Sequence, residues 1–193
     1  MAQSSQTISG QKTFKSAITV SEGATFTATG GVYKITAAST SLANLAVRDL
    51  ITVTGTTNNN ATFTVKSVDT NGTYVIVEET VTAEASDGST DTVLTYSGFV
   101  TDKYKGDGYY SQADGIHTGA YHVNTTCTGA IKMQGSLATT PTEDDWFDIT
   151  GTTFTTDLST TISSNNFTGN FVWVRAKCTA NTAGSVTKIL YNN

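Results

Sequence analysis

Threonine is the feature of this sequence that most constrains its fold, because 40 of the 193 residues are Thr, set between short apolar runs. A β-branched side chain is stiff at χ1 and fits a pleated, half-buried surface, so this abundance favours strands over helices. Only 14% of the residues are charged and there is one Pro, which leaves few side chains for catalysis. We therefore expect an all-β protein that acts as a structural or binding surface and is not an enzyme.

The bulk composition narrows the class of protein further. The hydrophobic fraction is 37%, below the roughly 45–50% of a typical globular chain, which favours thin β-sandwiches or subunits that complete their cores against partners. The net charge of −5 and the absence of basic runs argue against nucleic-acid binding. The N-terminus lacks the apolar core of a secretory signal, and no apolar stretch approaches about 20 residues, so no membrane insertion is expected.

The chain divides by pattern into three segments: an extended N-terminal arm over 1–22, a small β-barrel or sandwich over 23–97, and a second antiparallel β-sandwich over 98–193. Short strands joined by turns, without a long amphipathic helix, are typical of sandwiches and barrels. Strands are expected at 25–28, 32–36, 50–54, 62–68, 73–79, 92–96, 120–125, 130–135, 147–149, 152–156, 160–163, 171–178 and 186–191.

Two segments carry the clearest strand signals. Asp69-Thr70-Asn71-Gly72 separates two β-rich runs, and Asn-Gly in that setting is the strongest short-range hairpin signal. Residues 171–178 alternate, so that Val172, Val174, Ala176 and Cys178 share one face and Phe171, Trp173, Arg175 and Lys177 share the other.

The N-terminal arm shows a strand pattern over 13–20 but has no hairpin partner nearby. An unpaired edge strand is an aggregation hazard unless another strand covers it. We therefore expect this strand to pair with another chain, and we predict that Ile8, Phe14, Ile18 and Val20 are its assembly contacts.

The histidines and cysteines do not form a recognisable metal or catalytic site. His117 and His122 are five residues apart, which on an extended chain places them on opposite faces. Two cysteines, Cys127 and Cys178, are too few for a disulfide scaffold or a cysteine-only metal site. We expect buried thiols, with a single bridge between two strands as the alternative, and no metal or cofactor.

Acidic residues gather in two places. Glu143-Asp144-Asp145 precedes Trp146, and such a cluster is read here as a solvated loop that leads an aromatic anchor into the core, with Ca²⁺ binding as the alternative. The same two interpretations, a solvated loop and a Ca²⁺ site, apply to Asp102 and Asp107. A glycosidase needs two carboxylates opposed across a cleft, and the sequence does not bring two loops together.

Aromatic residues on Gly-rich loops are the candidate contact surface. Tyr104, Tyr109, Tyr110 and Tyr121 lie among Gly106, Gly108, Gly115 and Gly119. Such rings can bury in a neighbouring subunit, pack within their own loops, or stack on a sugar. We retain all three interpretations.

Three stretches resemble proteins of tailed-bacteriophage virions. Residues 6–14, QTISGQKTF, resemble the TIxGxKTF segment of phage fibre proteins, which sits near trimeric β-rich shafts. Residues 48–56 and 60–65 resemble a small virion β-domain with the pattern GDxIxVxGTxxNNGTFTV, although Arg48 and Ala61 stand where Gly is usual.

The third stretch, 170–177 with 184–191, is similar to a C-terminal β-sandwich of cyanophage-type virion proteins. The resemblance implies a non-enzymatic virion structural protein: a surface decoration or a fibre-like component, with a tail or neck component as the alternative. Its partners would be copies of itself, as a trimer, and other capsid or tail subunits. Independently of the resemblance, a carbohydrate-binding module that recognises host surface glycans through its tyrosines is the second hypothesis.

Overall fold

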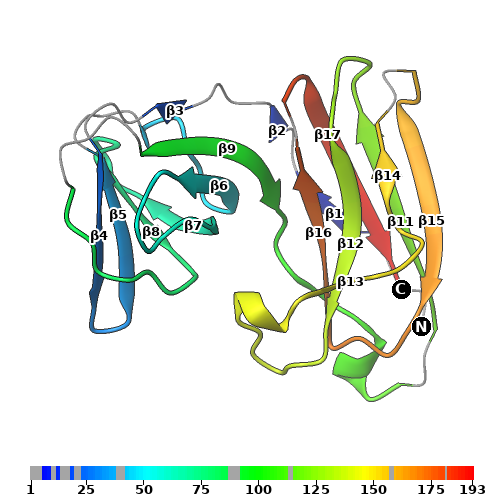
Figure 1. The fold of residues 1–193 in the computed structure, drawn as a ribbon. Coiled ribbons are helices and arrows are strands. Elements are labelled where there is room, and N and C mark those ends of the chain that lie inside the picture. Colours follow the sequence, from blue (N-terminus) through cyan, green and yellow to red (C-terminus); the bar gives the residue numbers. More distant parts are fainter. Residues whose placement is uncertain are drawn as a thin grey trace. The chain divides into compact units, whose positions relative to one another are not determined.

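The computed structural model describes residues 6–9, 12–13, 18–19, 23–37, 42–86, 92–112, 115–156, 159–180 and 182–193. It is all-β with antiparallel pairing, as predicted, apart from short 3₁₀ turns (Figure 1). Within these residues no helix has the length and apolar character that a membrane crossing requires. The chain forms two compact units, Lys15–Phe99 and a sandwich unit made of Met1–Phe14 with Val100–Asn193.

The Lys15–Phe99 unit is an antiparallel sheet in the order β9-β6-β7-β8-β5-β4, with β3 added to β9. Its inward-facing side chains are aliphatic or aromatic, as the alternation of apolar residues predicted. The strands are β3 (Ile18–Thr19), β4 (Ala24–Thr29), β5 (Val32–Ala37), β6 (Asp49–Thr54), β7 (Thr62–Val68), β8 (Tyr74–Val77) and β9 (Val93–Val100). The core includes Phe26, Ile35, Leu42, Ile51, Phe63, Val75 and Leu94.

The predicted Asn-Gly hairpin joins β7 to β8, which pair antiparallel. The Asp69 carboxylate accepts hydrogen bonds from the backbone N–H groups of Asn71 (3.2 Å) and Thr73 (3.3 Å) and from the Thr73 hydroxyl (2.8 Å). The Thr73 hydroxyl contributes most to lowering the pKa of Asp69. Gly72 has φ +68° and its Cα faces the Ala43 backbone closely, so glycine suits the position for both its conformation and its size.

The sandwich unit consists of two facing sheets. One has the order β1-β17-β11-β15, with β2 also on β17; in the other, β12 pairs with β13, β14 and β16, and β16 pairs with β10. The strands are β1 (Gln6–Ser9), β2 (Lys12–Thr13), β10 (Tyr104–Lys105), β11 (Ile116–Val123), β12 (Ala130–Ser136), β13 (Phe147–Asp148), β14 (Phe154–Thr155), β15 (Ile162–Thr168), β16 (Trp173–Thr179) and β17 (Ser185–Asn192).

Alternate residues of these strands fill the space between the two sheets, which is the arrangement of a β-sandwich. On β16, Val174, Ala176 and Cys178 are fully buried, and these are the inward positions that the alternation predicted. Further core residues are His117, Tyr121, Ile131, Met133, Phe167, Ile189 and Tyr191.

Both cysteines are buried and free, so the prediction of buried thiols is confirmed and the single bridge does not form. Burial raises the pKa of Cys127, and burial followed by the nearby Cys127 raises the pKa of Cys178 to about 12. Burial therefore favours the protonated thiol at both positions.

The N-terminal segment corrects one expectation. We expected the strand over 13–20 to lack a partner within its own chain, but Lys12–Thr13 pairs with β17 and Ile18–Thr19 pairs with β9. Ile8 belongs to β1, on β17, and Ile18 belongs to β3, whereas Phe14 and Val20 lie outside the described residues. The described strands of the arm therefore join sheets of both units, β1 and β2 on β17 and β3 on β9.

Candidate binding site

The candidate site is built where residues 103–110 run beside the start of β16. β10 pairs with β16 so that Tyr104 lies opposite Val174 and Lys105 opposite Trp173. The backbone N–H groups of Gly106 and Gly108 donate to Val172 O (3.1 Å) and Phe171 O (2.9 Å). This approach leaves no room for a Cβ at Gly106, whose own Cα faces the carbonyl oxygen of Phe171. The glycines thus allow the loop to lie against the strand.

Three aromatic rings meet above this contact. Tyr109 lies edge to face against Trp173, with ring centroids 5.0 Å apart at 63°, and against Tyr110, at 5.3 Å and 74°. The indole Nε1–H of Trp173 donates to Thr139 O at 3.0 Å, which holds the ring in one orientation. Tyr109 and Tyr110 remain 42% and 52% exposed, so the cluster offers ring surface to solvent.

Two lysines lie over these rings. Lys103 Nζ is 4.6 Å from the centroid of Trp173, and Lys105 Nζ is 4.0 Å from that of Tyr109 and 5.7 Å from that of Tyr110. These distances are within the range of cation–π attraction. Neither lysine takes part in the ion pairs that join described residues.

The rings and lysines border a cavity of about 260 Å³. Its walls are Lys103, Tyr104, Lys105, Tyr110, Trp173 and Asn193. The Asn193 side-chain amide donates to Lys105 O at 3.0 Å. Burial, and then the charge of Asp102, raises the pKa of Tyr104.

The structure brings together three of the four predicted tyrosines. Tyr121 does not belong to this surface, because it is fully buried in the sandwich core and donates its hydroxyl to Thr152 O at 2.8 Å. Burial raises its pKa strongly. The period-2 pattern of β11 buries positions 117, 119, 121 and 123, and that pattern was the available signal for placing Tyr121 inside.

The lysines and Trp173 are members of the site that sequence reasoning did not select. The local signal was the sequence Lys103-Tyr104-Lys105, a basic and aromatic triplet. The pairing of this triplet with Trp173, almost 70 residues later, is a tertiary contact. No local pattern predicts which strand it joins.

The two histidines occupy opposite faces of β11, as predicted. His117 is fully buried, with Nδ1 2.9 Å from the Tyr191 hydroxyl and Nε2 2.9 Å from Gly169 O. His122 is half-buried, and burial followed by the charge of Lys188 lowers its pKa. Both ring nitrogens of His117 have partners, so this residue serves the core.

The carboxylates for which Ca²⁺ binding was the alternative differ in their surroundings. Asp107 is buried and accepts a hydrogen bond from the Gly115 N–H at 2.6 Å, whereas Asp102 is exposed. Within the residues that the structure places, no group of three or more His, Cys, Asp or Glu side chains could hold a metal ion.

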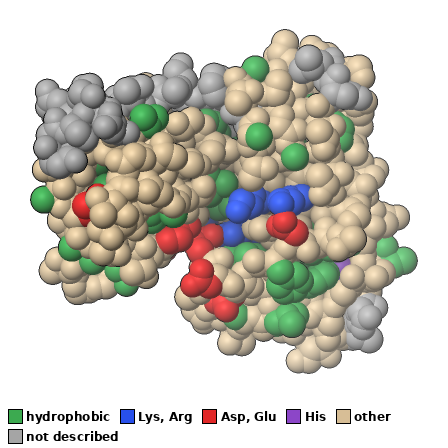
Figure 2. Space-filling model, in the orientation of Figure 1, with side chains coloured by type: hydrophobic (Ala, Val, Ile, Leu, Met, Phe, Trp, Pro, Cys, Tyr) green, Lys and Arg blue, Asp and Glu red, His purple; other side chains and the backbone are tan. Residues whose placement is uncertain are grey.

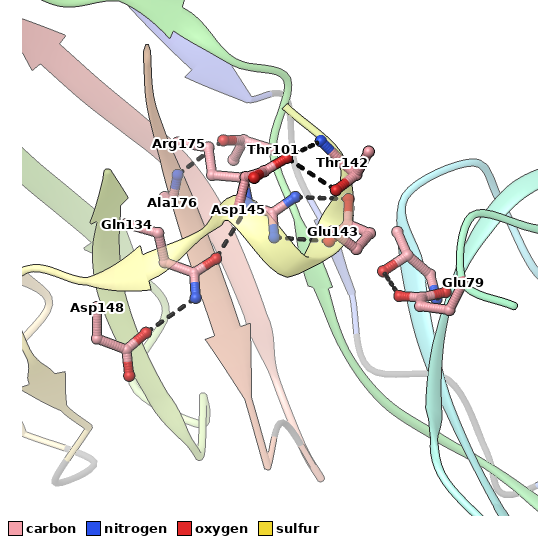
Figure 3. A network of polar contacts seen from close by, with 10 residues as sticks. Glu79, Thr101, Gln134, Thr142, Glu143, Asp145, Asp148, Arg175 and Ala176 are labelled. Atoms are coloured by element: carbon pink, nitrogen blue, oxygen red, sulfur yellow. Dashed lines mark hydrogen bonds and ion pairs between the residues drawn. The ribbon is translucent and has the colours of Figure 1, made fainter. Parts of the chain in front are cut away.

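The Glu143–Asp145 segment forms a 3₁₀ turn with a structural contact to β16 (Figure 3). The Glu143 carboxylate receives two hydrogen bonds from the Arg175 guanidinium, at 2.8 and 2.7 Å. The Thr142 backbone N–H, and then its hydroxyl, bonds to Asp145 and lowers the pKa of that carboxyl. Trp146 was expected to enter the core, but it is half-buried over Arg175, with the guanidinium carbon 4.2 Å from the ring centroid.

Two other cations of the sandwich unit, Lys132 and Arg175, have acidic partners. Figure 2 shows Lys and Arg side chains gathered on one face with Asp and Glu beside them. Lys132 pairs with Asp148, and Arg175 pairs with Glu143. Lys103 and Lys105 differ from these residues, since their close neighbours are aromatic rings.

Comparison with known proteins adds no relative. No protein-family model matches the chain, and a search of curated proteins finds no match either. The function is therefore argued from the residues and their geometry.

Proposed function

We propose that this chain is a non-enzymatic structural protein of a tailed-bacteriophage virion, a surface decoration or fibre-like component. The similarity of residues 6–14 to the TIxGxKTF segment of fibre proteins supports this class. So does an all-β architecture whose surface is rich in Thr and poor in charge, which suits stiff sheets in repeated contact with neighbours. The protein would be assembled into particles in the host cytoplasm.

One observation carries the proposal: the motif-bearing N-terminal segment supplies short strands to the edges of sheets in both units. β1 and β2 pair with β17, and β3 pairs with β9. A short edge strand that pairs with its sheet through the backbone can be exchanged between identical copies, which is a low-cost route to oligomers. We propose that residues 1–22 anchor the protein in the particle by this exchange, within a homotrimer.

The test has two parts. Light scattering on the purified protein should give three times the 20.3 kDa of one chain, and a variant lacking residues 1–22 should remain folded by circular dichroism but lose the trimer. In a phage complementation assay, the truncated protein should be absent from purified particles. Asp144→Asn, at an exposed position of the sandwich unit, is the control and should be incorporated normally. Normal incorporation of the truncated protein would overturn the anchoring role.

A second candidate function, recognition of a surface glycan, is supported by the cavity beside Trp173. Exposed rings with hydrogen-bond donors at the rim are the elements of a small-ligand site, and the apolar face of a sugar ring packs well on an aromatic face. A glycan array probed with the wild-type protein and with Tyr110→Ala tests it. Binding that depends on Tyr110 supports the function, and absence of binding to any glycan contradicts it.

A further inference from the structure

We infer that the cavity walled by Lys103, Tyr104, Lys105, Tyr110, Trp173 and Asn193 binds one sugar residue that carries an anionic group, a carboxylate or a sulfate. The inference rests on the proposed glycan recognition and specifies its ligand class. It is independent of the anchoring role proposed for the N-terminal segment.

The charge of the cavity wall is the first argument. The chain carries a net charge of −5, yet the six wall residues include two lysines and no Asp or Glu, and the acidic side chain of Asp102 lies near enough for its charge to reach Tyr104. Lys132 and Arg175, elsewhere in the same unit, are matched by Asp148 and Glu143. Lys103 and Lys105 instead lie over rings, so their charge is available to an anion that can form charge-assisted hydrogen bonds.

The hydrogen-bonding character of the wall is the second argument. A lysine ammonium only donates hydrogen bonds, and the wall holds two of them. The Asn193 amide nitrogen is directed to Lys105 O. A wall of donors suits a ligand that is rich in acceptors, and carboxylate and sulfate groups are acceptors only.

The rings supply the part of the site that recognises the sugar. Trp173 is held by its bond to Thr139 O and by the edge of Tyr109, so it is ordered before a ligand arrives, which reduces the entropy cost of binding. An exposed cation–π contact is weak, and an ammonium group can therefore turn from the ring to an anion while the sugar packs on the ring.

The size of the cavity limits the ligand. Its 260 Å³ lies just below the range of about 300–1,000 Å³ that encloses drug-sized molecules, so it accommodates a single sugar ring of a longer chain. Single-stranded nucleic acid also stacks on aromatic rings, but it needs a basic groove that follows the phosphates. Two lysines on an acidic protein do not form such a groove, and a saccharide fits better.

The experiment compares sugar chains whose acidic group is present with the same chains after that group is esterified or removed. Calorimetric titration of the full chain would compare oligogalacturonate with its methyl ester, and a sulfated galactan oligosaccharide with its desulfated form. We expect one or both acidic forms to bind at least tenfold more tightly than the matching neutral form. The double variant Lys103→Gln/Lys105→Gln should lose that preference, while the control Lys132→Gln should keep it. Both variants should show wild-type circular dichroism.

The outcomes separate the proposals. Equal affinity for acidic and neutral forms overturns the inference but leaves glycan recognition standing. No binding to these ligands or to any acidic glycan on an array overturns the inference, and no binding to any glycan overturns glycan recognition as well. The single-stranded oligonucleotide dT4 is titrated as a further ligand. If dT4 binds and no glycan does, the cavity recognises a nucleotide, and both the inference and the proposed glycan recognition are overturned. Acidic-sugar binding that survives the double lysine variant would also overturn the assignment to this cavity.

Discussion

Replacing Glu143 by Gln should destabilise the sandwich unit substantially, although Glu143 lies in a surface turn. Its carboxylate receives both terminal nitrogens of Arg175, whose side chain is only 3% exposed. Gln keeps the shape of the side chain but removes its charge and one acceptor oxygen. The guanidinium would then retain its bond to Gln134 (2.9 Å) and its contact with the Trp146 ring. It would no longer be hydrogen-bonded to a negatively charged group.

The expected magnitude follows from burial. Removing one partner of a buried ion pair costs about 3–5 kcal/mol, because the other charge is left uncompensated. The Glu143 side chain keeps 16% of its exposure, so water reaches the pair at that end, and Gln134 offsets part of the loss. We therefore expect Glu143→Gln to lower the free energy of unfolding by about 2–3 kcal/mol.

Urea unfolding followed by tryptophan fluorescence measures this change directly. Both tryptophans of the chain, Trp146 and Trp173, belong to the sandwich unit, so the signal reports that unit alone. Asp144→Asn is the matched control, since Asp144 is exposed in the same turn and should change stability by less than about 0.5 kcal/mol. A loss below about 0.5 kcal/mol in Glu143→Gln, or an equal loss in the control, would refute the reasoning.

Two substitutions and one labelling experiment test other parts of the structure. Lys177 lies directly opposite Lys132. Burial lowers the pKa of Lys177, and so do the nearby positive charges. Because the pKa of this lysine is lower in the folded than in the unfolded state, its charge destabilises the fold at every pH at which it is protonated. Lys177→Gln should therefore stabilise the protein by up to about 1 kcal/mol at pH 7, and urea titrations should show the gain vanishing as pH rises through about 10.4. Cys178, whose pKa burial raises to about 12, should resist a thiol reagent at pH 8 until urea unfolds the protein; rapid labelling of the native state would contradict this. Gly135→Ala would place a methyl group 2.6 Å from the Phe171 ring, and thermal unfolding should show a loss of about 1–3 kcal/mol.

Local patterns predicted the strands well, because alternation and turn residues act within a few positions. The Asn-Gly hairpin and the inward set Val174, Ala176 and Cys178 are examples. Both depend on the backbone and on side-chain direction along one strand. The candidate site was predicted in part for the same reason, since Tyr104, Tyr109 and Tyr110 are close in sequence.

What the sequence did not predict depends on contacts between distant segments. Arg175 falls on the outer face of β16 by alternation, yet it is buried because the 3₁₀ turn of Glu143–Asp145 and Trp146 cover it. The partners of the N-terminal strands and the meeting of Lys105 with Trp173 are also long-range pairings. Loop position and the choice of sheet edge are set by the whole fold, and no periodicity encodes them.

Arg48 shows how a local departure can be tolerated by the surrounding fold. It stands where the resembling virion pattern has Gly, and its φ is +72°, a left-handed conformation that costs a non-glycine residue roughly 1–2 kcal/mol. Its backbone N–H donates to Val65 O at 2.7 Å, which ties the residue to β7. The neighbouring strands of the unit impose this conformation on a residue that does not favour it.

The abundance of Thr has a structural consequence beyond strand propensity. Several threonines are buried, and their hydroxyls pair with backbone groups that the ladders leave open: Thr152 accepts from the Met133 N–H (3.1 Å) and donates to Ile149 O (2.7 Å). Thr101 likewise accepts from the Ala176 N–H at 2.9 Å. A hydroxyl with one donor and two acceptor positions satisfies such groups while its methyl packs as an apolar side chain. Thr101 and Thr152 thus satisfy backbone groups of β16 and β12 inside the core with an uncharged side chain.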